Sequence, residues 1–260
     1  MDQPQLRESL ARVGVPDELA ICVPAMPIDS SGLLLYGSRA RGDAVPDSDL
    51  DLLAIIEQPR PSILSGDVSV SYYTIAQLES GRGTLFGAHL KRDAKVLWDP
   101  KGELSTALSR MGEVDTERLF SRARNVSKIL GCPEMDLPKY LPGLLREARY
   151  LLRSCLYACA IADGHPCFSV REIAQRNADP SLAPLLASRH TAEPSVDDLI
   201  ECISRLEAIL GKLPINPHGS LEALVVNEWQ NGGDLLSMAF MALGTTGDDS
   251  DYAEVDKILL

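Results

Sequence analysis

Residues 33–56 read LLLYGSRARGDAVPDSDLDLLAII and contain the pattern from which the fold can be worked out. The stretch begins with an apolar run of strand length, breaks at Gly37-Ser38, and continues through a short polar segment rich in Gly, Pro and Asp. A second apolar run of strand length follows. The stretch therefore predicts a strand, a turn and a second strand.

Two acidic residues stand at the start of the second predicted strand. Asp49 and Asp51 are two positions apart, and side chains in a strand alternate with a period of two, so both carboxylates should point to one face. Neighbouring carboxylates attract a hard cation, and Mg²⁺ suits such a place because it takes oxygen ligands and shares its shell with water and phosphates. We therefore expect a Mg²⁺ site here.

The turn before these acids has the residues of a phosphate-binding loop. Gly37 lets the backbone approach a ligand closely, and Ser38 adds a hydroxyl group. Arg39 and Arg41 add fixed positive charge. From the residues alone, the turn is a candidate phosphate cradle facing a cation site.

In these positions the sequence resembles the nucleotidyltransferase superfamily, which includes DNA polymerase β, kanamycin nucleotidyltransferase and the small minimal nucleotidyltransferases. The superfamily pattern of Gly-Ser, a spacer and Asp-x-Asp is matched by Gly37-Ser38 and Asp49-Leu50-Asp51. The fuller pattern over residues 37–51 resembles the minimal and antibiotic-modifying branch. The resemblance covers about the first hundred residues and fades beyond them.

The resemblance implies a Mg²⁺-dependent enzyme that moves a nucleoside monophosphate from a nucleoside triphosphate, with ATP expected, to an acceptor hydroxyl. It implies that Asp49 and Asp51 are catalytic metal ligands. The residues that it assigns to the nucleotide on the N-terminal side are Gly37, Ser38, Arg39, Arg41 and Ser48.

A third carboxylate, which most members of the superfamily carry on the next strand, is not in its usual place. Val68–Tyr73 alternates as a strand should, but it offers Ser69 and Ser71 on the relevant face, with Asp67 only at its edge. Either Asp67 reaches the metal because the strand begins early, or it is a loop residue and the site has two carboxylates or none.

The rest of the chain divides into an α/β part and a helical part. Residues 1–102 predict helices over 3–13 and 16–25, the two strands already described, a loop over 57–67 and a strand over 68–73. A helix over 75–81, which continues or restarts over 84–91, and a strand over 94–98 follow. Residues 103–260 show helical spacing over 104–111, 116–130, 141–162, 170–178, 196–210 and 221–243. The predicted fold class is α+β, a small mixed-sheet nucleotidyltransferase domain followed by an all-α helical bundle.

The helix predicted over 141–162 carries a basic and aromatic stripe opposite its apolar face. We expect this helical domain to complete the nucleotide or acceptor site through Arg149 or Arg153, because ligand sites favour domain interfaces. The alternative is an exposed arginine face paired with local acids. His89, on a predicted helix of the first domain, is interpreted as a structural histidine in preference to a phosphate ligand.

Composition narrows the choice of partners and compartment. The formal charge of −12 disfavours a general DNA-binding protein, since phosphate backbones are held by basic surface. The six cysteines lack the spacing of a metal site or a disulfide scaffold, so we expect reduced thiols in a cytoplasmic protein. No apolar run is long enough to span a bilayer, and no membrane partner is expected.

The sequence leaves the acceptor open. It is a small molecule, as for antibiotic-modifying enzymes of the superfamily, or a protein or RNA, as for toxin–antitoxin ones. The alternative from another class is a catalytically impaired nucleotide-binding module that lacks the third carboxylate. The oligomeric state is also open, a homo-oligomer included.

Overall fold

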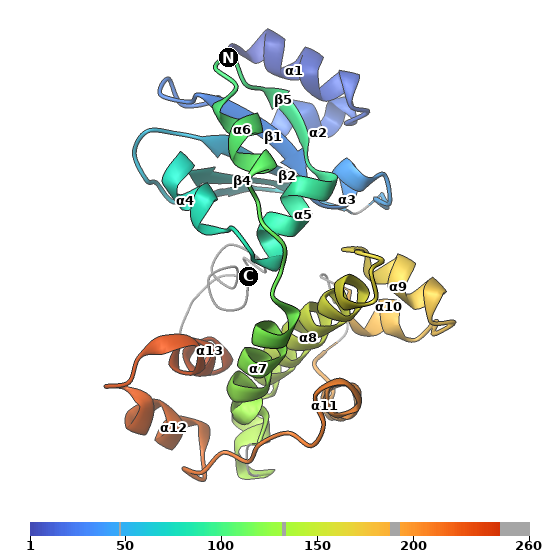
Figure 1. The fold of residues 1–260 in the computed structure, drawn as a ribbon, viewed down its shortest axis with the longest axis vertical. Coiled ribbons are helices and arrows are strands. Elements are labelled where there is room, and N and C mark those ends of the chain that lie inside the picture. Colours follow the sequence, from blue (N-terminus) through green and yellow to red (C-terminus); the bar gives the residue numbers. More distant parts are fainter. Residues whose placement is uncertain (47, 132–133, 188–192, 245–260) are drawn as a thin grey trace. The chain divides into compact units, whose positions relative to one another are not determined.

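The structure is a computed structural model that describes residues 1–46, 48–131, 134–187 and 193–244. Two compact units divide the chain, Met1–Val114 and Asp115–Leu259. The first unit contains a mixed sheet with helices, and the described part of the second is helical (Figure 1). This confirms the predicted fold class.

The first unit is built around one sheet of five strands in the order β3-β4-β2-β1-β5. The strands are β1 (Gly32–Tyr36), β2 (Leu50–Ile55), β3 (Ile63–Ser65), β4 (Val68–Tyr73) and β5 (Lys95–Trp98). β2 runs parallel to β4, and the other neighbouring pairs are antiparallel. The apolar runs at both ends of the 33–56 stretch therefore occupy central strands, where burial on both faces explains why they are almost uninterrupted.

Helices cover both faces of this sheet. Alternate residues of β1 divide between the two faces: Leu33 and Leu35 pack with α1 (Gln3–Arg12) and α2 (Asp17–Cys22), whereas Leu34 and Tyr36 pack with the other group. That group is α4 (Ile75–Ser80), α5 (Leu85–Asp93) and α6 (Glu103–Ser109). Each fully buried leucine contributes about 1.5–3 kcal/mol to this packing. The sheet is thereby fixed between two apolar layers.

The predicted turn between β1 and β2 contains a short helix, α3 (Gly37–Arg41). Ala40 is buried in the α1–α2 core, and Gly42 ends the helix in the left-handed conformation with φ of 85°. The backbone N–H groups of Gly42 and Asp43 both donate to the Ser38 carbonyl. A five-residue helix bounded by glycines has no periodicity to detect, so the sequence showed only a turn.

The segment predicted as a loop over residues 57–67 also contains a strand, and this prediction was wrong in part. β3 pairs antiparallel with β4 through a turn at Gly66, whose φ is 58°. All three residues of β3 are exposed. An exposed edge strand of this length shows no alternation between apolar and polar residues, which is why the sequence pattern did not indicate it.

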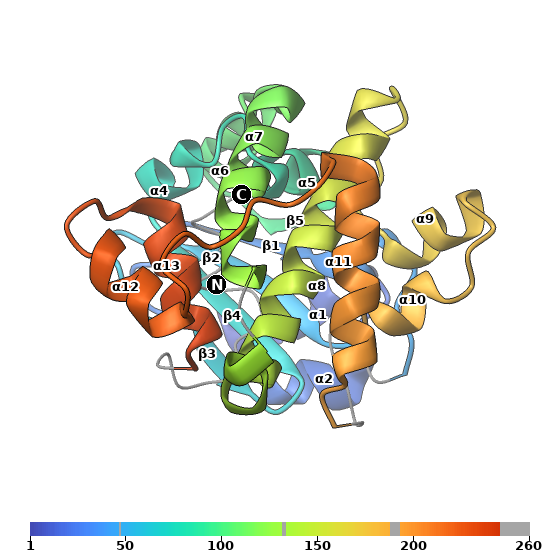
Figure 2. The same ribbon diagram turned by 90° about the horizontal axis from the view of Figure 1, so that it is seen from below.

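The second unit is a set of helices around α8. They are α7 (Thr116–Val126), the 3₁₀ helices η1 (Ser127–Leu130) and η2 (Glu134–Asp136), α8 (Leu137–Ala162), α9 (Val170–Arg176), α10 (Leu182–Leu185), α11 (Val196–Leu210), α12 (Leu221–Glu228) and α13 (Gly233–Ala242). Figure 2 shows α11 alongside α8, and α7 and α13 also pack against it. One core of buried residues joins these helices.

Glycines shape this unit at two places. The helix predicted over 221–243 is two helices, because Gly232 and Gly233 have φ of 61° and 83° and interrupt it. At Gly143, a Cβ would lie 2.0 Å from the backbone oxygen of Ala242, so α8 and α13 touch backbone to backbone. Only glycine permits that approach.

Candidate active site

The acidic residues of the motif lie at the start of β2. Strand pairing sets Asp51 opposite Tyr36 on β1 and beside Ser69 on β4. Paired residues share a face, so Asp51 lies on the side of the sheet covered by α4–α6. Asp49 is half-buried and precedes Leu50, the first residue of β2, so alternation along the strand begins only after it.

The turn after β1 touches the Asp51 carboxylate directly. Gly37 has φ of 74°, and a Cβ built on it would lie 2.2 Å from Asp51 Oδ2 and 3.1 Å from Cγ. No residue with a side chain fits there without moving the carboxylate. The glycine of the predicted phosphate cradle and an acid of the predicted cation site therefore belong to one site.

Arg39 reaches across the loop to the residues that lead into β2. Its Nε donates to the backbone carbonyls of Ser48 and Asp49, each at 3.1 Å, and its Nη2 donates to the Ser48 carbonyl at 2.6 Å. The Ser48 hydroxyl in turn accepts a hydrogen bond from the Val45 N–H at 2.8 Å. Arg39 and Ser48, both predicted to bind nucleotide, thus have partners inside the loop.

Arg41 is held by side chains of its own unit. Its Nε lies 3.2 Å from Asp43 Oδ1, and its Nη1 lies 2.9 Å from Nε2 of His89 on α5. Burial, reinforced by the charges of Arg41 and Arg92, lowers the pKa of His89 to about 3. The imidazole is therefore neutral near pH 7 and accepts the Arg41 hydrogen bond, which agrees with a structural histidine.

Within the described part of the chain, no third acid forms a metal-binding cluster with the first two. Asp67 is exposed in the turn before β4, where its carbonyl accepts a hydrogen bond from the Leu50 N–H at 2.8 Å. The residue beside Asp51 on β4 is Ser69. Among the described residues, no group of three or more His, Cys, Asp and Glu side chains could hold a metal ion.

Two carboxylates are nevertheless a reasonable fit for Mg²⁺. This ion commonly binds through one or two protein carboxylates and fills its remaining positions with water and substrate phosphates. The close approach of Gly37 to Asp51 leaves backbone, not side chain, beside the carboxylate. Asp49 and Asp51 would supply the protein oxygens of such a site.

The arginines predicted on α8 contact other helices of the second unit. Arg149 Nη2 lies 2.7 Å from Asp198 Oδ2 on α11, and Arg153 Nη2 donates to the Leu186 carbonyl at 2.9 Å. Burial lowers the pKa of Arg149, and Asp198 opposes that shift. Arg149 is only 12 % exposed, so its guanidinium group is not on a solvated face. Its role in nucleotide binding stays a prediction.

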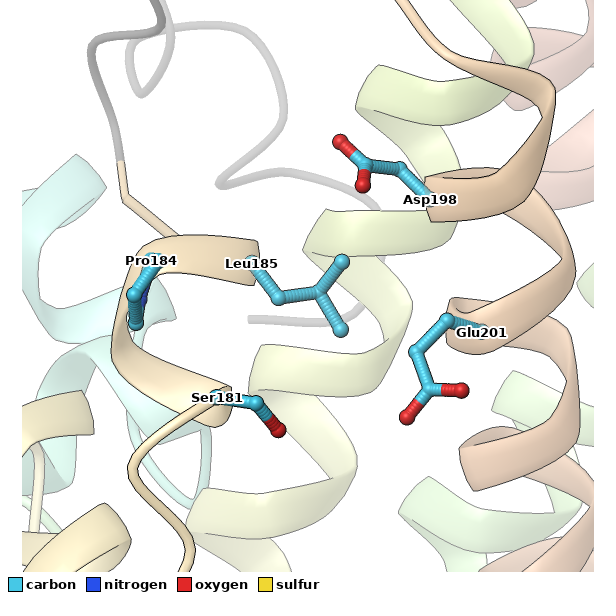
Figure 3. Close-up of a pocket in the computed structure, with 5 residues that line it drawn as sticks. All are labelled: Ser181, Pro184, Leu185, Asp198 and Glu201. Carbon is cyan, nitrogen blue, oxygen red and sulfur yellow. The ribbon is translucent and has the colours of Figure 1, made fainter.

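A surface pocket of about 390 Å³ lies beside this contact, between α10 and α11 (Figure 3). Asp198 and Glu201 of α11 line one side, and Ser181, Pro184 and Leu185 line the other. Both acids are paired with arginines, Asp198 with Arg149 and Glu201 with Arg205 at 2.6 Å. The pocket is therefore not a free acidic surface.

Comparison with known families identifies the region that carries the motif. Residues 27–114 match the family described as the nucleotidyltransferase domain. The match includes all five strands, Gly37, Ser38, Asp49 and Asp51, and it ends at the last residue of the first unit. No curated protein matches the chain. Residues 27–114 are thus similar to nucleotidyltransferase domains.

Within the described ranges, the structure shows no helix with the length and apolar character needed to cross a membrane.

Proposed function

We propose that the chain transfers a nucleoside monophosphate from a nucleoside triphosphate to an acceptor hydroxyl, with Mg²⁺ as the cofactor, because residues 27–114 match the nucleotidyltransferase domain family. The observation that carries the proposal is the contact between Gly37 and Asp51, where a Cβ would lie 2.2 Å from the carboxylate oxygen. It supports a single site in which the phosphate turn and the acids act together. ATP is the expected triphosphate.

Each residue of the site has a part in this reaction. Asp49 and Asp51 would hold Mg²⁺, which would supply positive charge to neutralise the phosphate oxygens. Gly37 lets the phosphates approach the backbone, and the Ser38 hydroxyl donates to a phosphate oxygen. The acceptor oxygen loses its proton to water and bonds to the α-phosphorus. The bond from that phosphorus to the α–β bridging oxygen breaks, and pyrophosphate leaves.

A nucleotide-binding module with impaired catalysis is the second candidate. The pairing of Asp51 with Ser69 supports it, because a serine hydroxyl is a neutral and weaker ligand than a carboxylate. With fewer acidic ligands the site still binds phosphates through the turn but holds a cation less tightly. The two candidates differ in whether the bond between the α-phosphorus and the pyrophosphate group is ever broken.

Labelled ATP separates the two candidates. The full chain is incubated with Mg²⁺ and ATP carrying radioactive phosphorus at either the α or the γ position. The acceptors tested are the protein itself, total RNA and a small-metabolite extract. Nucleotidyl transfer moves the α label to one fraction and releases the γ label as pyrophosphate. A chain that binds ATP and transfers the α label to none of these fractions is a binding module.

Substitutions then test the two acids. Asp49→Asn or Asp51→Asn should lower transfer on the order of a thousandfold or more, because each removes a ligand and a charge. Asp67→Asn is the matched control, since Asp67 is exposed in the turn before β4 and its backbone alone makes the bond to Leu50. If Asp67→Asn were as inactive as the other two, Asp67 would be the missing third carboxylate.

A further inference from the structure

We propose that Arg39 is a positioning residue, which fixes the backbone of Ser48 and Asp49 so that Asp49 enters β2 ready to bind the cation. This proposal rests on the proposed function. It replaces the expectation that Arg39 binds the phosphates directly.

The contacts of Arg39 define this role. Two of its nitrogens, Nε and Nη2, make three hydrogen bonds to the carbonyls of two successive residues, Ser48 and Asp49. A guanidinium group is planar, so two neighbouring carbonyls that converge on it have a fixed relative orientation. A hydrogen bond to a charged group is worth about 1.5–3 kcal/mol, more than most single contacts in a loop.

Other backbone hydrogen bonds of the described loop residues lie on either side of Asp49. Described residues between the end of α3 and the start of β2 belong to no helix or strand. Val45 and Ser48 bond to each other, and the ladder to β4 begins with Leu50, whose N–H donates to the Asp67 carbonyl. Arg39 joins α3 to the last two loop residues. A metal ligand must be placed to within about 0.5 Å, so loss of this link should weaken the affinity for the cation.

The two roles for Arg39 predict different effects of its replacement on the affinities for ATP and for metal. A phosphate ligand contributes to ATP affinity even without metal, and lysine largely replaces its charge. A positioning residue contributes to metal affinity even without ATP, and lysine fails because it lacks the planar fork that reaches two carbonyls. Arg39→Gln and Arg39→Lys therefore separate the roles. Arg60→Gln is the matched control for charge, because Arg60 pairs with Asp29 at 2.8 Å on an exposed loop.

The experiment measures three quantities on the full chain. Mn²⁺ binding is followed by electron paramagnetic resonance without nucleotide, and ATP binding is measured by calorimetry in EDTA. Hydrogen exchange reports the protection of the Val45 and Ser48 amides, which are bonded within the loop. In Arg39→Gln and in Arg39→Lys we expect Mn²⁺ affinity to fall about tenfold or more. Exchange of both amides should quicken, and ATP affinity in EDTA should stay at the parent value.

Other results overturn the proposal. Weaker ATP binding in EDTA with unchanged Mn²⁺ affinity would make Arg39 a phosphate ligand, as would full recovery in Arg39→Lys. Unchanged exchange at Val45 and Ser48 would show that Arg39 does not hold the loop. A parent chain that binds no Mn²⁺ would refute the proposed function, and the exchange measurement would still decide separately whether Arg39 orders the loop.

Discussion

Replacing Gly37 with alanine should greatly lower the activity of the site. The loss of folding stability should be little more than that caused by a strained backbone. At φ of 74° a residue with a Cβ pays about 1–2 kcal/mol. The added Cβ would also lie 2.2 Å from Asp51 Oδ2. That atom is the end of a side chain, so the carboxylate can turn away by about 1 Å instead of forcing the backbone apart. A ligand displaced by that much costs about a hundredfold in rate.

Gly42→Ala is the matched control for this change. Gly42 also has a positive φ, of 85°, and its added Cβ would meet no described atom within 4 Å. Both variants should therefore lose similar stability in urea unfolding. Only Gly37→Ala should lose Mn²⁺ affinity in the absence of nucleotide and α-label transfer in its presence.

A double mutant tests whether the clash is the cause. In Gly37→Ala with Asp51→Ala the carboxylate is gone, so any destabilisation beyond that of Gly42→Ala should disappear. The reasoning is refuted if Gly37→Ala binds Mn²⁺ and transfers label as Gly42→Ala does. The carboxylate would then not lie against the turn as described.

Three further changes test the strand pairing, the helix packing and the buried histidine. Ser69→Asp adds a carboxylate beside Asp51 and should tighten Mn²⁺ binding about tenfold or more by calorimetry; unchanged affinity would contradict the pairing. Gly143→Ala brings a Cβ to 2.0 Å from the Ala242 oxygen, a backbone atom that cannot turn aside, and should cost roughly 3 kcal/mol in urea unfolding. A loss no larger than 0.5 kcal/mol, roughly that of an ordinary surface change, would argue against the close packing. The pKa of His89 is about 3 in the folded chain, so below pH 6.5 the unfolded chain binds more protons than the folded one. The free energy of unfolding therefore decreases as the pH is lowered. By urea unfolding at pH 7 and pH 5, His89→Gln should lose less stability than the parent, by up to about 1.4 kcal/mol per pH unit; equal losses would show that His89 is accessible to protons.

The local sequence pattern was enough to predict most of the secondary structure of the first unit. The two apolar runs of residues 33–56 became central strands, and Gly37 and Asp51 met because β1 and β2 are joined by a short connection and pair directly. The alternation of Val68–Tyr73 predicted β4, and helical spacing predicted α4 and, in the second unit, most of α8. Apolar runs, alternation and helical spacing each involve residues close together in the chain, so they can be detected in the sequence alone.

The partners of the charged side chains were decided only by the tertiary structure. Arg39 bonds to carbonyls that lie 9 and 10 residues away, and Arg149 pairs with Asp198, 49 residues away. Long flexible side chains have many rotamers, and which one is occupied depends on which neighbours the folded backbone offers. The sequence could therefore show that positive charge lies near the motif but not which group each arginine contacts.

The residue that lies beside Asp51 on β4 was likewise decided by the tertiary structure. The residues of β2 and β4 each predict a strand, but their register depends on the parallel pairing set by the whole sheet. That register puts Ser69, and not Asp67, next to Asp51. By itself the sequence determined strands β1, β2, β4 and β5, the turn and the acids, because each follows from local chemistry. The tertiary structure decided which groups meet, because strand register and side-chain contacts join residues far apart in the chain.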